Sequence, residues 1–412
     1  MDSQTFRQSF QQAVSTNDAT LLQDVMAIIA KVRQEKDQAL FAYTEQYDQQ
    51  TLATLRVPEQ HLKESYEQLE DQVKSALKLA RDRIIAYETQ IKNQDQSFGD
   101  FQYVYRPIEK VGIYVPGGTA LYPSSVLMTV VPAQVASVKE IHVTTPTFMA
   151  NNITFATLYL LGVKHVYTVG GAQAIAALAY GTETIPKVDK IVGPGNAYVA
   201  MAKRLVFGDV GIDAIAGPSE ILLYVDDSIN IDAIVYDLFA QAEHDANART
   251  FLLSESSATI DAINQRLDQL LPQQPRQGII RQSLDQNHYQ IVDSRENLLA
   301  VINEIACEHV SIQHQDEAAI VAQINYAGAV FKGQYSPEAM GDYIAGPSHV
   351  LPTAGTARFS HGLNVNDFMT SHAVVGLAQE NFNKLVDAAA IIAETEQLFA
   401  HRDSLMIRKE VN

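Results

Sequence analysis

Residues 239–250, FAQAEHDANART, carry side chains that could bind a metal ion. Gln241 and His244 are three residues apart, so a helix would place them on one face, with Asp245 beside them. That face could hold a metal ion, or His244 could be a packed imidazole without such a role. The spacing alone leaves both interpretations open.

A second group of reactive side chains is the run Cys307, Glu308 and His309. A carboxylate and an imidazole together supply bases that work near neutral pH. Because neighbouring residues of a strand point to opposite faces, Glu308 and His309 can serve one site only at a strand end or a turn. The Cys307 thiol offers a different chemistry, a nucleophile that traps an aldehyde, although a lone cysteine at the start of a strand is more often simply buried.

Three further histidines stand in unusual surroundings. Asp342 precedes His349 by seven residues in GDYIAGPSHVLP, and Glu396 precedes His401 by five in ETEQLFAHRD, whereas His361 in RFSHG is a weaker candidate. The sequence contains no H-E-x-x-H motif and no closely spaced set of three ligands. A zinc site would therefore have to be assembled from distant segments.

Glycine-rich loops are the last group of segments that could bind a ligand: VPGGTA (115–120), VGGAQA (169–174) and VGPGNAY (192–198). Loops of this kind, between a strand and a helix, aim backbone N–H groups at an anion. None matches the dinucleotide fingerprint G-x-G-x-x-G, because Tyr198 stands where the third glycine would be. Each loop taken singly is explained by a tight turn, but three in one region favour a phosphate-bearing ligand.

The elements that position these residues follow an alternating pattern from residue 100 onward. Short β-rich runs such as VGIYV, EIHVTT and HVYTVG alternate with apolar helical stretches, and a second series of the same kind follows AGPSEILLYVDD. This pattern predicts an α/β fold with two tandem Rossmann-like parallel-sheet units, duplicated and incomplete, with helical N- and C-terminal extensions. The expected domains are an N-terminal helical extension (1–10), a first α/β domain with most zinc and catalytic residues (11–110 plus 220–363), a second α/β domain with the glycine loops and the cofactor site (111–219) and a C-terminal helical tail (364–412).

Length and composition limit the number of domains and the classes of partner that the chain can have. A chain of 412 residues exceeds the size of one hydrophobic core, and a net charge of −18 argues against a nucleic-acid or anionic membrane surface. One cysteine excludes an internal disulfide and a cysteine-rich zinc site. The polar start lacks a signal peptide, and the most apolar stretch is interrupted by Pro132, so we expect a cytoplasmic protein.

Taken in order, these stretches make the chain resemble the histidinol dehydrogenase family over about residues 105–405. The resemblance rests on VGIYVPGGTA, VGGAQAIAALAYGT, KIVGPGNAYVAMAKR, AGPSEILL, QAEHD, EHV, GDYIAGPSHVLPT and the terminal pair Glu396 and His401. It implies a zinc-dependent, NAD-linked oxidation of L-histidinol through L-histidinal to L-histidine in histidine biosynthesis. Two NAD molecules would be reduced for each histidine formed, and one zinc ion would be bound per subunit.

The resemblance also implies roles for particular residues. Zinc would be held by Gln241, His244, Asp342 and His401, and acid–base catalysis would be carried by Glu308 and His309. The substrate would contact these zinc ligands and His309, together with Ser219, His349 and Glu396. The NAD site would be lined by Tyr114, Gln173 and Asn196. The family implies a homodimer in which Glu396 and His401 reach the partner's site, with no nucleic-acid or membrane partner.

Two positions depart from the family pattern: Cys307 stands where we expect proline, and Gln397 stands where glycine is usual. Two other functional classes also fit parts of the sequence. A zinc hydrolase could use Glu308 and His309 on water, but it leaves the three glycine loops unexplained. A non-catalytic two-lobed protein that binds a small molecule fits the duplicated layout, but it gives no reason for the Glu308–His309 pair.

Overall fold

The computed structural model describes residues 1–10, 19–117, 121–146, 152–215 and 217–409 of the chain. Two compact units are distinguished by their contacts. Unit 1 comprises Met1–Ile91 and Ile108–Phe368, and unit 2 comprises Lys92–Pro107 and Met369–Asn412. In the described ranges, no helix combines the length and the apolar character that crossing a membrane requires.

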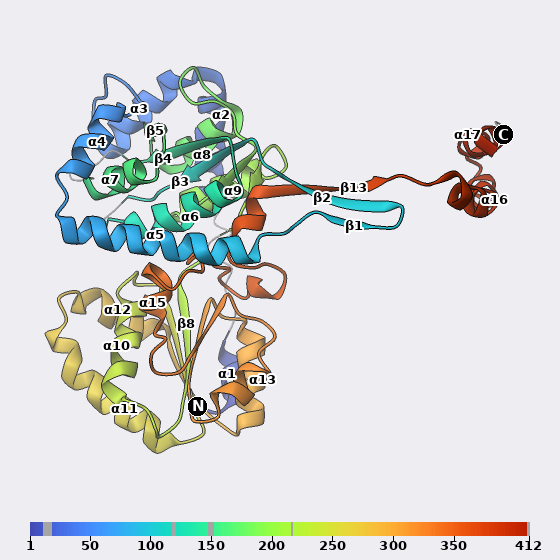
Figure 1. The fold of residues 1–412 in the computed structure, drawn as a ribbon. Coiled ribbons are helices and arrows are strands. Elements are labelled where there is room, and N and C mark those ends of the chain that lie inside the picture. Colours follow the sequence, from blue (N-terminus) through green and yellow to red (C-terminus); the bar gives the residue numbers. More distant parts are fainter. Residues whose placement is uncertain (11–18, 118–120, 147–151, 216, 410–412) are drawn as a thin grey trace. The chain divides into compact units, whose positions relative to one another are not determined.

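Unit 1 contains a first five-stranded sheet in the order β5-β4-β3-β6-β7. Figure 1 labels three of its strands, β3, β4 and β5. All neighbouring strands are parallel. The strands are β3 (Lys110–Tyr114), β4 (Glu140–Thr145), β5 (His165–Thr168), β6 (Lys190–Val192) and β7 (Gly211–Ile212), and the intervening helices are α6 (Pro123–Val135), α7 (Asn152–Leu160), α8 (Gly171–Tyr180) and α9 (Ala197–Val206). The chain runs outward from β3 to β5 and then crosses back to β6.

A second parallel sheet of unit 1 repeats this order as β10-β9-β8-β11-β12. Its strands are β8 (Glu220–Val225), β9 (Arg249–Ser254), β10 (His288–Val292), β11 (His309–Gln313) and β12 (Ala329–Lys332). The helices and turns between them are α10 (Ile231–Ala242), α11 (Ser257–Leu270), η1 (Leu271–Gln273), α12 (Gln277–Asn287), α13 (Arg295–Ile305) and α14 (Glu317–Val321). Each sheet thus has the strand order 3-2-1-4-5, the Rossmann order without its sixth strand, which confirms the predicted tandem, incomplete α/β architecture.

The central strands of the second sheet are buried along their whole length. Every residue of β8, β9 and β11 is buried, as expected for parallel strands that helices cover on both faces. The short helix α1 (Ser3–Ser9) adds to this core, because Phe6 packs edge-on against the ring of Phe251 in β9. The described N-terminal helix is therefore part of the lobe built on the second sheet, β8 to β12.

Four further helices lie between α1 and the first sheet: α2 (Ala19–Glu35), α3 (Asp37–Asp48), α4 (Glu59–Glu67) and α5 (Asp71–Ile91). In α2, Val25, Ile28, Ile29 and Val32 recur at helical spacing and enter the same core as α8. Helix α4 lies against α7, and α5 lies against α6. These contacts are with the first sheet's helices, whereas the sequence grouped residues 11–110 with 220–363. The domain limits themselves stay a prediction.

Three short elements complete unit 1 after β12: α15 (Glu338–Tyr343), η2 (Thr356–Arg358) and η3 (Val365–Phe368). These elements and the loops between them connect the parts of unit 1 built on the two parallel sheets by hydrogen bonds. The Ser348 hydroxyl donates to the carbonyl of Met128 in α6 at 3.1 Å, and Lys190 of β6 donates to the carbonyl of Asp367 at 2.7 Å. The segment after β12 therefore brings residues of the second lobe into contact with α6.

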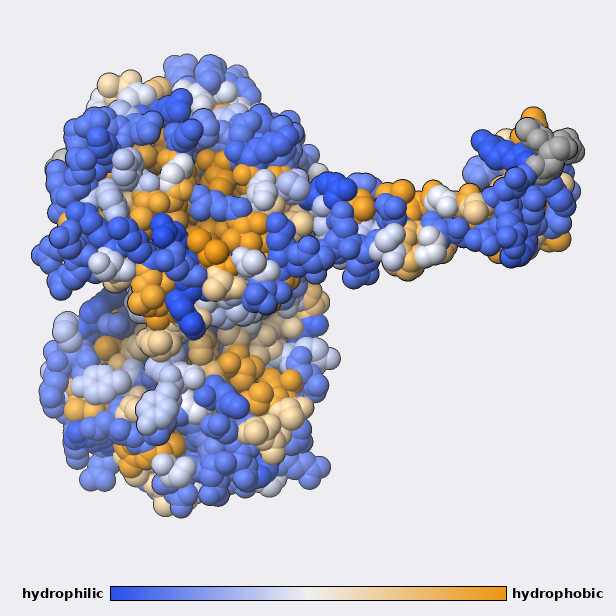
Figure 2. All heavy atoms as spheres, viewed as in Figure 1, coloured by the Kyte–Doolittle hydropathy of each residue, from blue (hydrophilic) through white to orange (hydrophobic). Residues whose placement is uncertain are grey.

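Unit 2 is a three-stranded antiparallel sheet followed by two helices. Its elements are β1 (Gln96–Phe98), β2 (Phe101–Pro107), β13 (Met369–Val375), α16 (Gln379–Thr395) and α17 (Phe399–Lys409). The predicted helical tail is present in α16 and α17, but it is preceded by a strand that the sequence analysis did not expect. Large hydrophobic side chains are exposed along the sheet and the helices, among them Phe98, Phe101, Val375, Ile391, Ile392 and Phe399 (Figure 2).

Candidate active site and metal centre

The predicted acid–base pair lies at the amino-terminal end of the second sheet's two central strands. Strand β8 begins at Glu220 and its parallel neighbour β11 begins at His309, so Ser219 and Glu308 directly precede these strands. Glu308 and His309 occupy a strand end, as the sequence required. In open α/β sheets, ligands usually bind at the carboxyl ends of the strands, so this lobe presents its reactive groups at the opposite edge.

His309 is buried and its ring is held in one tautomer. Its Nδ1 atom lies 3.1 Å from the backbone carbonyl oxygen of Glu220. Because a carbonyl oxygen can only accept, Nδ1 carries the hydrogen and Nε2 keeps its lone pair. Burial lowers the pKa of His309 to about 4, which keeps the imidazole neutral near pH 7. His309 is therefore arranged as a base that acts through Nε2.

Glu308 is buried beside this imidazole. Its Oε2 atom accepts the backbone N–H of Glu220 at 2.8 Å and lies 3.7 Å from His309 Nδ1. Burial raises the pKa of the Glu308 carboxyl well above its usual range. A carboxyl group with a raised pKa is a stronger base once ionised, and this suits it to remove a proton from water.

Glu308 and His309 share a small buried network with Glu220 and Arg249. The Arg249 guanidinium donates to Glu220 Oε1 at 3.0 Å, and the Ala354 N–H donates to Glu220 Oε2 at 3.1 Å. With its carboxylate fixed in this way, the Glu220 backbone is held where its N–H meets Glu308 and its carbonyl meets His309. The sequence analysis did not identify Glu220 as part of the site.

Gln241 provides a direct test of whether these residues suit a metal ion. Its side chain is fully buried, and neither its Oε1 nor its Nε2 atom has a hydrogen-bond partner among the residues that the structure describes. Leaving a buried amide unpaired costs about 1–3 kcal/mol, so such a group needs a ligand to complete its contacts. The amide oxygen is free to bind a cation, and the donor set fits the implied metal.

His244 and Asp342 complete the part of the donor set that belongs to unit 1. His244 follows the end of α10, where its N–H donates to the Gln241 carbonyl at 3.3 Å. Its Nε2 atom lies 4.0 Å from Asp342 Oδ2 in α15. Imidazole, carboxylate and amide carbonyl are all oxygen or nitrogen donors that divalent ions such as Zn²⁺ accept. The structure thus brings His244 and Asp342 together from segments almost one hundred residues apart.

His349 joins this cluster through Asp342. Its Nδ1 atom lies 2.9 Å from the Asp342 carbonyl oxygen, and its Nε2 atom lies 3.2 Å from the Ser125 hydroxyl of α6. His309, Asp342 and His349 line a pocket of about 390 Å³, to which Tyr87 and His361 also contribute. This volume is in the range of small-molecule sites, and its lining combines several imidazoles with a carboxylate.

Glu338 is a site residue that the sequence analysis missed. One ligand atom each of His309, Glu338 and Asp342 lies within 4.8 Å of the others. Glu338 and Asp342 are four residues apart in α15, so they share one face of that helix. The sequence PEAMGD contains this four-residue spacing. The spacing points to Glu338 only if Asp342 is already taken as a site residue.

The predicted cofactor residues lie at the carboxyl edge of the first sheet. Tyr114 ends β3, Gln173 lies in the first turn of α8, and Asn196 caps α9 by accepting the Val199 N–H at 3.1 Å. The edge between β3 and β6 is the point where the strand order reverses, the usual place for a nucleotide. Burial raises the pKa of the Tyr114 hydroxyl to about 12, so the group stays protonated.

The glycine loops at this edge are held mainly by the protein itself. The Gly171 N–H donates to the Tyr114 hydroxyl at 3.1 Å, and the Gly193 N–H donates to Asp213 Oδ2 at 2.8 Å. Gly193 has a φ of +118°, and a Cβ there would lie 2.1 Å from the Tyr114 carbonyl oxygen, so only glycine fits. Two of the N–H groups expected to face an anion are thus used internally. Residues 118–120 of the first loop lie outside the described residues.

Glu396 and His401 belong to unit 2, where both side chains are exposed. Cys307, the residue behind the thiol alternative, is fully buried, and burial raises its pKa well above the usual thiol range. A buried, protonated thiol is a poor nucleophile. This finding argues against the thiol chemistry that the sequence left open.

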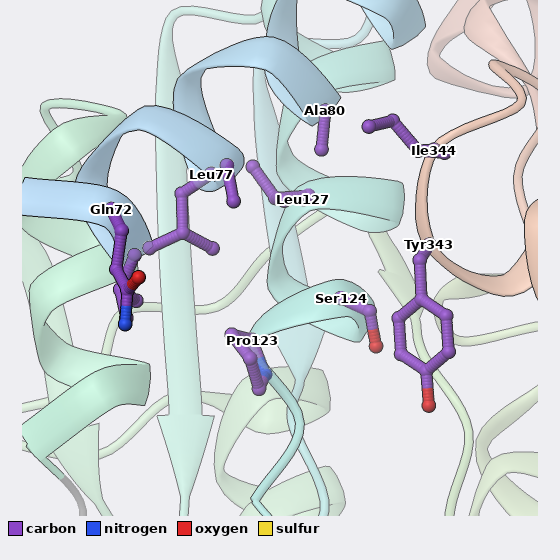
Figure 3. Close-up of a pocket in the computed structure, with 10 residues that line it drawn as sticks. Gln72, Leu77, Ala80, Pro123, Ser124, Leu127, Tyr343 and Ile344 are labelled. Atoms are coloured by element: carbon purple, nitrogen blue, oxygen red, sulfur yellow. The ribbon is translucent and has the colours of Figure 1, made fainter.

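A second pocket, of about 490 Å³, lies between α5, α6 and the end of α15 (Figure 3). It is lined mainly by apolar side chains, including Leu77, Ala80, Leu127 and Ile344, with Ser124 and Tyr343 beside them. No carboxylate or imidazole contributes to its described lining. It offers hydrophobic contact rather than acid–base chemistry.

A family model, two relatives and a crystal structure to which the chain is similar all belong to one family. The histidinol dehydrogenase family model matches residues 11–409. Histidinol dehydrogenase of Staphylococcus saprophyticus is 49% identical over 406 residues, covering 96% of each chain. That of Staphylococcus epidermidis is 48% identical and covers 99% of this chain and 100% of its own. The crystal structure of histidinol dehydrogenase from Elizabethkingia anophelis superposes with a TM-score of 0.91 at 34% identity, covering 95% of this chain and 92% of that one.

Proposed function

The chain belongs to the histidinol dehydrogenase family, and we propose that it oxidises L-histidinol through L-histidinal to L-histidine with reduction of two NAD. The step would belong to histidine biosynthesis in the cytoplasm. The observation that carries this proposal is the buried His309, whose Nδ1 hydrogen is bound by a backbone carbonyl and which lies within 4.8 Å of Asp342, one of the proposed metal ligands. A base held in one orientation beside proposed metal ligands suits a reaction in which a bound metal anchors the substrate while the base removes its hydroxyl proton.

Zinc would be held by Gln241, His244 and Asp342, with His401 as the fourth protein ligand. The unpaired Gln241 oxygen and the short approach of His244 to Asp342 support this assignment. When bound, zinc supplies an anchor for the imidazole and amino nitrogens of the substrate, and NAD receives the hydride of each oxidation. Neither anchor nitrogen changes in the first oxidation, so these residues also retain the aldehyde.

The proton chemistry is assigned to His309 and Glu308. His309 Nε2 accepts the hydroxyl proton of the alcohol in the first oxidation and that of the aldehyde hydrate in the second. Glu308 removes a proton from water so that the water adds to the aldehyde carbonyl. The burial of both groups supports this division, because it keeps His309 neutral and makes the Glu308 carboxylate basic.

The substrate would lie at the amino-terminal edge of the second sheet, beside His309. The cofactor would lie at the carboxyl edge of the first sheet. Ser219, His349 and Glu396 would contact the substrate, and the pocket beside His309 and His349 supports that position. Tyr114, Gln173 and Asn196 would line the NAD site, supported by their place at the reversal of strand order in the first sheet.

A homodimer is the proposed assembly, with Glu396 and His401 of each chain contributing to the partner's site. Unit 2 supports this arrangement, because many of its large hydrophobic side chains are exposed and few are buried in a core. Apolar side chains that no core covers favour association with another surface.

Nicotinamide reduction on adding L-histidinol is the experiment that separates this function from the other classes. We expect the zinc-loaded protein to generate absorbance at 340 nm with L-histidinol and NAD. We expect His309→Asn to keep its zinc but to lower this rate to a small residual value that only single-turnover measurements detect. A hydrolase would leave NAD oxidised, and a binding protein would retain the ligand unchanged. Either result would overturn the proposed function.

A further inference from the structure

We propose that Glu338 is a positioning residue that, together with the Glu220 carbonyl, holds the His309 ring in the orientation needed for proton transfer. The inference rests on the proposed function, in which His309 is the base of both oxidations. It adds a residue to the site for which neither the sequence motifs nor the family resemblance supplied a role.

The contact between the two side chains is direct. Glu338 Oε1 lies 3.2 Å from His309 Nδ1, and the same nitrogen lies 3.1 Å from the Glu220 carbonyl oxygen. Because Nδ1 bears the hydrogen, the Glu220 carbonyl accepts it, and the Glu338 carboxylate lies close enough to the same nitrogen to attract the partial positive charge of the N–H group. A hydrogen bond to β8 and an electrostatic contact with α15 restrict rotation of the ring more than either would alone. Fixing a histidine through the nitrogen that does not react is how many enzymes orient a catalytic imidazole.

The position of Glu338 is itself fixed by close packing. Glu338 is the first residue of α15, after Pro337, and its side chain is buried. A Cβ on Gly341, three residues further, would lie 2.6 Å from the ring of Phe331 in β12. The helix therefore approaches β12 as closely as glycine permits. The Phe331 ring in turn packs against His309, with ring centroids 5.9 Å apart.

Stability does not explain a carboxylate at this place. Glu338 Oε2 is buried without a hydrogen-bond partner in the described part of the chain. A buried carboxyl group with an unpaired oxygen is unfavourable for folding. A residue that costs stability yet contacts the proposed base is better explained by its effect on that base.

The first test compares Glu338→Ala with Glu338→Gln. A glutamine amide oxygen can still place partial negative charge beside Nδ1, whereas alanine cannot. We expect Glu338→Ala to lower kcat on the order of 10- to 100-fold for both alcohol and aldehyde oxidation, with KM and zinc content unchanged, and Glu338→Gln to lose less than about tenfold. Unchanged kcat in Glu338→Ala, or equal losses in both variants, would overturn the proposal.

A double-mutant cycle tests whether Glu338 acts through His309. In the His309→Asn background, measured by single turnover, we expect Glu338→Ala to cause no further loss, because the ring that it orients is gone. A full additional loss would mean that Glu338 acts on something else. Loss of zinc in proportion to activity would instead identify Glu338 as a metal ligand and overturn the positioning role.

Glu255→Ala is the matched control. Glu255 Oε1 lies 3.5 Å from His314 Nε2, a carboxylate–imidazole pair at the opposite edge of the same sheet. We expect this variant to keep wild-type kcat. If the wild-type protein reduces no NAD with L-histidinol, the proposed function fails. If it does and the Glu338 variants behave like wild type, only the positioning role fails.

Discussion

At the scale of single residues, we assign different tasks to Glu308 and His309 because their surroundings differ. His309 Nδ1 is bound to a backbone carbonyl, which leaves Nε2 as the base, whereas Glu308 Oε2 accepts the Glu220 N–H. Burial acts in opposite directions on the two groups, lowering the pKa of the imidazole and raising that of the carboxyl. One base is thus suited to the substrate hydroxyl and the other to water.

The division of roles is tested by Glu308→Gln. We expect this variant to slow the oxidation of L-histidinal on the order of 100- to 1000-fold and the oxidation of L-histidinol to the aldehyde less than about tenfold, because only the aldehyde step needs activated water. The two half-reactions are measured by supplying the aldehyde directly or by trapping it. An equal loss in both would contradict the assignment of Glu308 to water.

Sequence reasoning found this pair because adjacency at a strand end is a local property. The residues that support it were not found, since their roles depend on contacts between distant segments. Glu220 is one charged residue at the start of a strand, and Glu338 reaches His309 only because α15 packs on Phe331. The unpaired Gln241 amide was likewise visible only in the folded chain.

At the scale of elements, the two sheets could be predicted and the small antiparallel sheet could not. Alternating strand and helix runs mark a parallel α/β unit locally, and right-handed crossovers then restrict the strand order. Strand β13 pairs with β2 across more than 260 residues of sequence, from Met369↔Pro107 to Val375↔Phe101. No turn signal joins the two strands, so the tail appeared purely helical from its sequence.

The departure at Gln397 has a physical consequence at the end of α16. Gln397 has a φ of 60°, and the Leu398 N–H donates to the Ala393 carbonyl at 2.9 Å, a helix ending that favours glycine. We expect Gln397→Gly to raise the free energy of unfolding by about 0.5–1 kcal/mol, by relieving left-handed backbone strain. Hydrogen exchange in α16 and α17 measures this effect. Gln397→Ala should bring no such gain, and equal stabilisation by alanine would contradict the explanation.

Glu88 ties α5 to η3 and makes stability depend on pH. Its Oε2 accepts the Val365 N–H at 2.7 Å, its Oε1 has no partner among the described residues, and burial raises its pKa to about 7. Because the folded state holds this proton more tightly than the unfolded state, whose carboxyl has a pKa near 4.5, stability falls as pH rises from about 4.5 to 7.

Glu88→Gln should remove this dependence while keeping an acceptor for Val365. We expect the variant to gain up to about 3 kcal/mol over wild type as pH rises through this window, with little difference below it. Urea unfolding at several pH values gives the comparison. A difference that stays constant across the window would show that Glu88 does not titrate there.

At the scale of the whole molecule, the site of unit 1 has a pocket, a base and three of the four proposed metal ligands. The remaining groups, Glu396 and His401, are exposed on the helices of unit 2, and that unit also exposes hydrophobic side chains. An assembly of two chains would bury these surfaces and complete each site with residues of the other subunit.

Mixing two inactive variants tests whether the sites are shared. His309→Asn and His401→Asn are expected to be inactive alone. Random reassortment makes about half of the dimers mixed, each with one intact site, so activity should return to about a quarter of wild type. No recovery, in a mixture shown by mass to contain mixed dimers, would mean that each site uses its own His401.

The count of reduced cofactor per substrate tests the central claim most directly, namely that one anchored substrate is oxidised twice in place. Zinc-loaded protein is given a limiting amount of L-histidinol with excess NAD, and NADH, L-histidinal and L-histidine are measured at completion. We expect about two NADH and one L-histidine for each L-histidinol, with no free aldehyde. One NADH with L-histidinal accumulating in solution, or no NADH at all, would contradict the account.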